Sequence, residues 1–137
     1  MTEPITAPEG AELVFDDGIP GFPDLHRFVL VDVVEDGAFQ ELRSVDDPTV
    51  SMIVCVPWLF FPDYAPEVPE DDRTELDLRD PEDAVVFCPV TLDEQRDAIY
   101  VNLFGPFVVN SSTRRGRQLV LTDSGYPLRA RLDLEPA

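Results

Sequence analysis

The chain is poor in the residues that most often carry enzyme chemistry. Its 137 residues include one histidine, His26, and two cysteines, Cys55 and Cys88. These are too few for the usual zinc ligand sets, and both cysteines lie in apolar runs, where thiols generally behave as small core residues. The sequence has no nucleophile elbow, no phosphate-binding glycine loop and no calcium loop. We therefore expect no enzymatic activity, no cofactor and no metal site.

The chain also contains no lysine, and all ten of its basic residues are arginine. Against them stand 28 aspartate and glutamate residues, so the formal net charge is -18 at pH 7. This charge repels the phosphates of nucleic acids and anionic membrane surfaces at long range. We therefore expect no direct nucleic-acid binding, whereas a basic partner protein would be attracted and steered toward this chain.

No long hydrophobic run is present either. A membrane-spanning helix needs about 18 or more consecutive apolar residues, and the sequence has no such stretch. Residues 1–10 are acidic and lack the basic and apolar regions of a signal peptide, which predicts a cytoplasmic protein without membrane contact. The composition, 44% hydrophobic, predicts a single folded domain over residues 1–137. We expect its core at residues 12–134 and a flexible acidic segment at residues 1–11.

Charge is distributed unevenly along the chain. Residues 63–83 contain ten acidic and two basic residues, whereas residues 113–131 contain five arginines and one aspartate. The acidic run is either a solvated connection that keeps the protein soluble or a docking face for a cationic partner. For the arginines, ion pairing with the acidic surplus of the same chain is favoured over phosphate binding.

Short apolar or alternating stretches, separated by Gly, Pro and Asp turns, predict strands along most of the chain. In residues 49–56 the side chains alternate between two faces. Val50, Met52, Val54 and Val56 fall on one face, and Ser51, Ile53 and Cys55 fall on the other. The predicted strands are residues 12–15, 26–34, 39–43, 49–56, 85–92, 98–103, 107–110, 117–121 and 128–134. Fourteen prolines leave room for only one or two very short helical turns, near residues 64–69 or 112–116. The pattern predicts an all-β fold, a small antiparallel β-barrel-like or sandwich domain.

Five motifs in a fixed order are more specific than this general pattern. They are F-x-x-G-I-P-G-F-P at 15–23, L-x-S-x-D-D-P at 42–48, Pro57 followed by F-P-D-Y at 61–64, N-L-x-x-P-x-x-x-N at 102–110, and Q-x-x-L at 118–121. In this order and spacing the chain resembles the FliW family of flagellar assembly factors over residues 12–134. It departs from the family pattern at Trp58-Leu59, an apolar pair where members vary, and at Gly105, where alanine is common. The residues of the resemblance to which we assign structural roles are Gly18, Pro20, Gly21, Phe22, Pro23, Asn102, Pro106 and Asn110.

The resemblance implies a small antiparallel barrel and a cytoplasmic protein without catalysis. It also implies two protein partners, flagellin and the translational regulator CsrA, an RNA-binding dimer that represses flagellin mRNA. A free FliW protein antagonises CsrA, and cytoplasmic flagellin titrates FliW away, so that translation follows export. Two alternatives remain open: an acidic interaction module or chaperone for another basic partner, and a small enzyme or metal-binding domain.

The sequence also suggests where partners bind. Aromatic side chains beside charges are typical of an interface anchor with an electrostatic rim. The predicted partner-binding residues are Phe60, Phe61, Asp63, Tyr64, Glu67, Glu70, Asp71, Asp72 and Glu75. Alternatively, Phe60 and Phe61 only cap the core. In the loop at residues 18–23 we expect Ile19 and Phe22 to plug one end of the barrel, with a partner surface as the alternative for Phe22.

Overall fold

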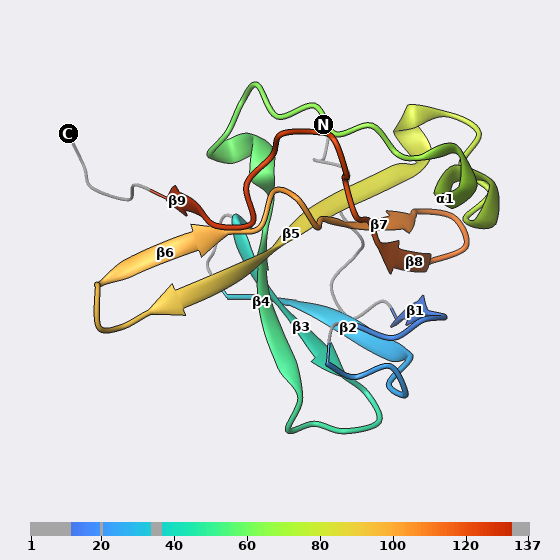
Figure 1. The fold of residues 1–137 in the computed structure, drawn as a ribbon. Coiled ribbons are helices and arrows are strands. Elements are labelled where there is room, and N and C mark those ends of the chain that lie inside the picture. Colours follow the sequence, from blue (N-terminus) through green and yellow to red (C-terminus); the bar gives the residue numbers. More distant parts are fainter. Residues whose placement is uncertain (1–11, 20, 34–36, 133–137) are drawn as a thin grey trace.

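The computed structural model describes residues 12–19, 21–33 and 37–132, and within these ranges the chain forms nine strands and one α-helix (Figure 1). The strands are β1 (Glu12–Phe15), β2 (Arg27–Asp32), β3 (Phe39–Ser44), β4 (Ser51–Cys55), β5 (Ala84–Asp93), β6 (Ala98–Val101), β7 (Phe107–Asn110), β8 (Arg115–Gln118) and β9 (Ala130–Leu132). The helix α1 (Glu70–Glu75) and two 3₁₀ turns, Pro57–Leu59 and Pro81–Asp83, lie between β4 and β5. None of the helices in these ranges has the length and apolar character needed to cross a bilayer.

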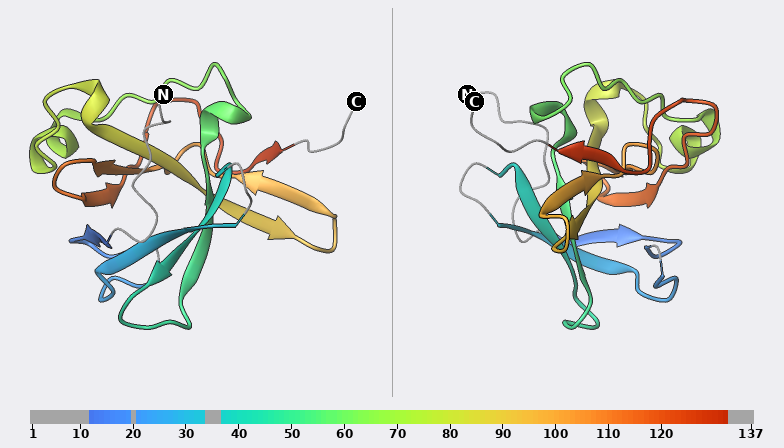
Figure 2. Two further views of the ribbon diagram at one scale, coloured as in Figure 1. Left: turned by 180° about the vertical axis from the view of Figure 1, so that it is seen from behind. Right: turned by 60° about the vertical axis from the view of Figure 1, so that its left-hand side comes forward.

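Seven of the described strands close into a barrel. The strand order is β4-β3-β2-β1-β8-β7-β5-β6-β9, and β4 also pairs with β5, which joins the first seven strands into a ring. Neighbouring strands run antiparallel except β1 and β8, which are parallel, with Val14 opposite Arg115 and Phe15 opposite Gly116. In Figure 1, β1, β2 and β3 lie below β7 and β8, and the β5–β6 hairpin projects to the left; Figure 2 shows the same arrangement from two other sides. The predicted small antiparallel barrel-like domain is confirmed, except that the prediction did not include the one parallel pair, β1 with β8.

The longest strand, β5, pairs with three neighbours in succession. Residues 84–87 pair with β7, Cys88 and Pro89 pair with β4, and residues 90–93 pair with β6. β9 then extends this side of the sheet by pairing with β6. The nearly continuous apolar run of β5 suits a strand that is covered on both faces. β5 therefore joins the closed barrel to the projecting hairpin.

Buried side chains form one cluster inside the barrel and two on its outer surface. The interior cluster consists of Leu13, Phe15, Ile19, Phe28, Leu30, Leu42, Val54, Val85, Phe87, Phe107 and Val109. The strands between these clusters are buried on both faces. In β4, Val54 lies inside, with Val50 and Met52 packed against the same cluster, while Ile53 and Cys55 belong to a second cluster outside. The predicted alternation is therefore confirmed for residues 50–55, whereas Val56 follows the end of β4 and is not part of the interior cluster.

The strand predictions hold in position for most elements, but the predicted bounds of β8 and both predicted helical turns are wrong. β8 covers Arg115–Gln118 and not residues 117–121, because Leu119 and Leu121 leave the barrel and donate their amides to the carbonyls of Pro106 and Phe104. The helical turn lies at Glu70–Glu75 and not at residues 64–69. Pro66 and Pro69 explain this shift, because a proline disfavours helical backbone in the residue before it.

The second predicted helical turn, at residues 112–116, is also wrong. Asn110 accepts the amides of Ser112 (2.8 Å) and Thr113 (3.2 Å) through its side-chain oxygen, and Arg114 has a φ of 63°. This left-handed residue reverses the chain, so β7 and β8 form a hairpin. The predicted ends at residues 34 and 133–134 lie outside the described residues.

The loop at residues 18–23 folds back on itself within the connection from β1 to β2. Ile19 and Phe22 exchange backbone hydrogen bonds (3.3 and 2.9 Å), and Gly21 has a φ of 85°, which suits the third position of a tight turn. Ile19 is 4% exposed and joins the interior cluster, as predicted. The prediction for Phe22 is wrong: its side chain is 43% exposed, because the turn directs it away from the barrel. Pro20 lies outside the described residues.

The two asparagines of the N-L-x-x-P-x-x-x-N motif bind backbone groups. The side-chain oxygen of Asn102 accepts the amides of Phe104 (3.0 Å) and Gly105 (2.8 Å). Asn110 is 3% exposed and donates its side-chain amide to the carbonyl of Leu76 at 2.7 Å. Pro106 accepts the amide of the chain that follows β8. These contacts fix the loop before β7 and fasten the end of α1 to the barrel wall.

Candidate partner-binding surface

The acidic segment, which we define as residues 63–83, connects β4 to β5 along the chain and lies on the outer face of the barrel beside β7 and β8 (Figure 1). Leu76 and Leu78, which are 4% and 6% exposed, pack with Val108 of β7 and with Leu119 and Leu121. Val108 points outward from the barrel because its neighbours in β7 point inward. The acidic segment is therefore a packed cover on the barrel wall, and it holds most of its carboxylates on the outside.

The three aromatic residues predicted to anchor a partner lie mainly in the core. Tyr64 is 4% exposed; its hydroxyl donates to the carbonyl of Leu103 at 2.8 Å, and its ring lies 4.8 Å from that of Tyr126. Phe60 and Phe61 are half-buried against the second cluster, and the ring of Phe60 lies 5.3 Å from that of Phe39. In this conformation Tyr64 is not accessible to a partner, and the two phenylalanines offer only part of their rings.

The acidic residues of the prediction are more accessible. Asp63, Glu67, Glu70, Asp71 and Glu75 are exposed. Asp72 differs, because its carboxylate pairs with Arg117 of β8 at 3.0 Å and its side chain is only 20% exposed. The exposed acids are thus free to meet a cationic partner, whereas Asp72 holds the acidic segment in place.

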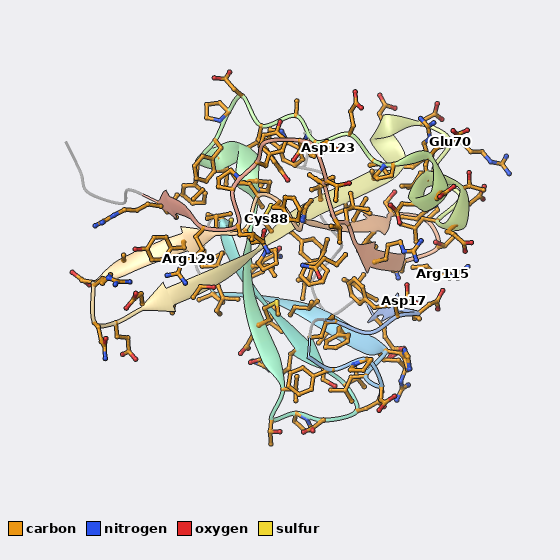
Figure 3. All side chains as sticks on the ribbon, in the orientation of Figure 1. Asp17, Glu70, Cys88, Arg115, Asp123 and Arg129 are labelled. Carbon is orange, nitrogen blue, oxygen red and sulfur yellow. The ribbon has the colours of Figure 1, made fainter. Side chains whose placement is uncertain are left out.

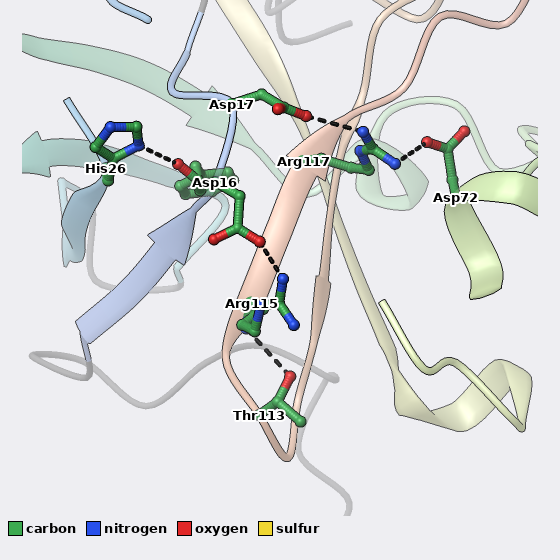
Figure 4. A network of polar contacts seen from close by, with 8 residues as sticks. Asp16, Asp17, His26, Asp72, Thr113, Arg115 and Arg117 are labelled. Carbon is green, nitrogen blue, oxygen red and sulfur yellow. Dashed lines mark hydrogen bonds and ion pairs between the residues drawn. The ribbon is translucent and has the colours of Figure 1, made fainter. Parts of the chain in front are cut away.

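Three of the five arginines at residues 113–131 pair with carboxylates of the same chain, which agrees in part with the pairing favoured from the sequence (Figure 4). Arg117 binds both Asp17 (2.8 Å) and Asp72, and Arg115 binds Asp16. Arg129 lies 3.8 Å from Asp93. The hydrogen bond to Asp17 raises the pKa of Arg117 further, so its charge is permanent. Among these pairs, within the described residues, only that of Arg117 with Asp72 reaches the acidic segment.

A groove runs between the acidic segment and the chain that follows β8. Its wider part has a volume of about 980 Å³, and an adjoining hollow of about 630 Å³ reaches Gly18 and Ile19. Pro69, Val120 and Thr122 line both parts. We refer to the wider part and the adjoining hollow together as the Val120 groove. Its lining residues are Asp17, Gly18, Ile19, Ala65, Pro66, Glu67, Val68, Pro69, Glu70, Asp71, Asp72, Arg73, Leu78, Arg79, Asp80, Ala84, Arg117, Gln118, Val120, Leu121, Thr122, Asp123, Ser124 and Tyr126.

The groove brings together four of the nine predicted partner-binding residues: Glu67, Glu70, Asp71 and Asp72. Glu70 and Asp123, from the two sides of the groove, both lie along the upper edge of the molecule in Figure 3. The other five predicted residues lie outside the groove. The acidic part of the prediction is therefore gathered at one surface, and the aromatic part is not.

Sequence reasoning missed Val120 and Tyr126. Val120 is 58% exposed between two buried leucines, and the hydroxyl of Tyr126 accepts the amide of Ala65 at 3.0 Å. A signal for Val120 was present, because an apolar residue at the outward position of an alternating stretch has no core to fill. Tyr126 lies in a Gly/Pro-containing stretch without periodicity, so no comparable signal marks it.

Comparison with known proteins gives matches that cover nearly the whole chain. The profile of the FliW protein family matches residues 2–132. The flagellar assembly factor FliW of Clostridium beijerinckii is 36% identical over 125 residues, which cover 91% of this chain and 89% of that protein. That of Moorella thermoacetica is 38% identical over 121 residues, which cover 88% of this chain and 77% of that protein.

The fold gives the same result. A crystal structure of the flagellar assembly factor FliW superposes with a TM-score of 0.84 at 28% identity, covering 97% of this chain and 93% of that one. Family profile, relatives and fold coincide over the barrel and over the acidic segment that covers it. The chain therefore belongs to the FliW family.

Proposed function

We propose that this chain is a cytoplasmic flagellar assembly factor that binds two protein partners in turn and performs no catalysis. The partners are flagellin and the translational regulator CsrA. Free of flagellin, the protein binds CsrA and relieves its repression of flagellin mRNA; bound to flagellin, it leaves CsrA active. The observation that supports this proposal is the similarity, over 91% of the chain, to a protein named as a flagellar assembly factor.

The charge distribution supports the CsrA part of the proposal. A protein that binds RNA presents cations to phosphate groups, so it is drawn to a surface of opposite charge. The exposed acids of residues 63–83 provide such a surface, and none of Asp63, Glu67 or Glu70 forms an ion pair within the described residues. Attraction of this kind raises the association rate more than it lowers the dissociation rate.

The partner switch needs differential affinity and no chemical step. If flagellin and CsrA exclude each other, the binding of one lowers the apparent affinity for the other by the same factor, whichever is added first. Purified chain is therefore titrated calorimetrically with flagellin and with CsrA from the same organism, separately and then with the other partner present at saturation. The proposal expects two saturable isotherms, each abolished by the other partner.

The electrostatic part has its own test. The association rate with CsrA is measured from about 50 to about 300 mM NaCl, a range over which the screening length shortens about 2.5-fold. We expect the rate to fall steeply for the natural chain and less steeply for the double variant Glu67→Gln/Glu70→Gln. The control Asp24→Asn/Glu94→Gln removes the same charge from exposed positions outside the acidic segment and should keep the natural slope. Binding of another basic protein, with neither flagellin nor CsrA bound, would favour a general acidic interaction module instead.

A further inference from the structure

Among the residues that the structure describes, one edge of the chain that follows β8 has no backbone partner. β1 pairs with β8 only as far as Gly116, so the edge beyond it is open. The amides of Leu119 and Leu121 donate to the carbonyls of the loop at residues 104–106. Since amide directions alternate along extended chain, the N–H of Val120 points away from that loop. Within the described residues, neither the N–H nor the C=O of Val120 has a hydrogen-bond partner.

This open edge faces the Val120 groove. Val120 and Thr122 line both hollows of the groove, and the side chain of Val120 is 58% exposed. Pro66, Val68 and Pro69 of the acidic segment line the groove as well. Prolines lack an N–H, so this side offers apolar surface and few competing backbone donors. In Figures 1 and 2 the chain after β8 and the first part of the acidic segment both cross the same end of the molecule.

The charges of the lining residues indicate which kind of partner segment the groove can bind. Seven acidic and three basic residues line it. Two of these bases are already neutralised, since Arg79 pairs with Asp77 and Arg117 pairs with Asp17 and Asp72. The remaining surplus of carboxylates attracts cations. A cationic chain with some apolar side chains therefore complements both the charge and the apolar surface.

We infer that the Val120 groove binds an extended, basic segment of a partner protein by β-strand addition to the open edge at Val120. Backbone hydrogen bonds to Val120 supply part of the affinity, as in other complexes that extend a sheet at its edge. Alternate side chains of the segment are arginine or lysine, which meet the carboxylates, and apolar residues, which pack on Val120 and the prolines. The inference adds a binding mode to the proposed function and rests on it only for the identity of the partner.

The first test uses the natural full-length chain and synthetic peptides. The probe is a peptide of about eight residues in which Arg and Val alternate, and binding is followed by NMR shifts of the chain and by calorimetry. We expect saturable binding with the largest shifts at Val120 and its neighbours. In a matched control peptide, the backbone nitrogens on the edge that would pair with Val120 are methylated. This peptide should bind about tenfold more weakly, because it lacks the N–H groups that would donate to the edge. A Glu/Val peptide should not bind. Equal binding of the methylated peptide, or binding of the acidic one, would overturn the inference.

The second test changes the edge itself. Val120→Pro removes the unpaired N–H of Val120 and leaves the donors of Leu119 and Leu121 in place. We expect about tenfold weaker peptide binding. Val120→Thr keeps the N–H and the branched shape and should bind within about threefold of the natural chain. Circular dichroism and the melting temperature verify that the variants fold. If Val120→Pro does not fold, the comparison of the methylated and unmethylated peptides on the natural chain tests strand addition instead. Natural affinity in a folded Val120→Pro variant contradicts strand addition.

Purified flagellin and CsrA separate this inference from the proposed function. If either partner binds the natural chain and binds Val120→Pro about tenfold more weakly, the groove is its docking site. If both bind Val120→Pro with natural affinity, the groove is not the partner site and the proposed function still stands. If the Arg/Val peptide behaves as expected but neither protein binds, the binding mode stands and the proposed function fails.

Discussion

Arg117 of β8 and Asp72 of α1 form an ion pair in which Nη1 lies 3.0 Å from Oδ1. Both side chains are largely covered, with exposed fractions of 27% and 20%. The same guanidinium binds Asp17 at 2.8 Å, in the connection that leads into the 18–23 loop (Figure 4). Arg117 therefore ties the acidic segment and this loop to β8, beside the parallel pairing of β1 with β8.

Replacing Arg117 with glutamine should loosen this junction. Two ion pairs are lost and two carboxylates are left close together, so the free energy of unfolding should fall by about 1–2 kcal/mol. The measurement is urea unfolding at low salt. Arg79→Gln is the control, because its pair with Asp77 is widely exposed, and it should change stability by less than about 0.5 kcal/mol. Equal effects of the two substitutions would show that Arg117 does no more than a surface arginine.

Most strands could be predicted from the sequence because they follow local alternation or a local apolar run, whereas β8 (Arg115–Gln118) has neither and was predicted too far along the chain. The order of strands could not, since β1 pairs with both its neighbour β2 and the distant β8, and the β1–β8 contact is parallel. The position of α1 was not predicted, because the prolines beside it were taken only as evidence against long helices. Pro69 in fact marks its start, where three acids complement the positive end of the helix.

The candidate site was also only partly predictable, because part of it depends on contacts between distant segments. The charge of a segment can be read from its composition, and the exposed acids do lie in the predicted stretch, residues 63–75. Exposure of aromatic rings depends on tertiary packing: the ring of Tyr64 faces inward because its hydroxyl finds the carbonyl of Leu103, 39 residues away. The groove needs residues from the acidic segment and from the chain after β8, and sequence spacing gave no sign that these two meet.

Gly18 and Gly21 both have positive φ, yet substitution should affect them differently. A β-carbon at Gly18 (φ 71°) would lie 2.4 Å from the carbonyl oxygen of Phe22, whereas one at Gly21 (φ 85°) would meet nothing within 4 Å. Gly21→Ala should therefore cost only the left-handed penalty, about 1–2 kcal/mol. Gly18→Ala must also displace backbone and should cost about 3 kcal/mol or more. Thermal and urea unfolding measure both, and similar losses would contradict the close approach at Gly18.

Phe22 and Phe28 offer a comparison of one exposed and one buried ring. Phe28 is fully buried and its ring lies 5.7 Å from that of Phe15, so Phe28→Ala should cost about 3–5 kcal/mol. Phe22 is 43% exposed, so Phe22→Ala should cost less than about 1.5 kcal/mol. Calorimetric titration with flagellin and CsrA then shows whether the exposed ring contacts a partner. A loss for Phe22→Ala as large as for Phe28→Ala would contradict its exposure.

Cys55 and Cys88 face each other across β4 and β5 and are 1% and 0% exposed. Burial raises the pKa of Cys88 to about 12 and that of Cys55 still further. In the unfolded chain both thiols ionise near pH 8.5, so unfolding becomes easier above about that pH. The stability that the neutral thiols contribute is fully present below about pH 8.5 and is lost as the pH rises toward the folded pKa values.

Between pH 7 and about pH 9 the free energy of unfolding should therefore fall by about 1–2 kcal/mol because of these two thiols. The measurement is a series of urea unfolding curves across this range, with a reductant present. The variant Cys55→Ala/Cys88→Ala is less stable at neutral pH, because it leaves space in the core, but its stability should change less over the same range. Groups that ionise elsewhere in the chain affect both proteins alike, so the difference between the two slopes isolates the thiols. Parallel slopes would mean that the thiols ionise as readily in the folded barrel as in the unfolded chain, which their burial does not allow.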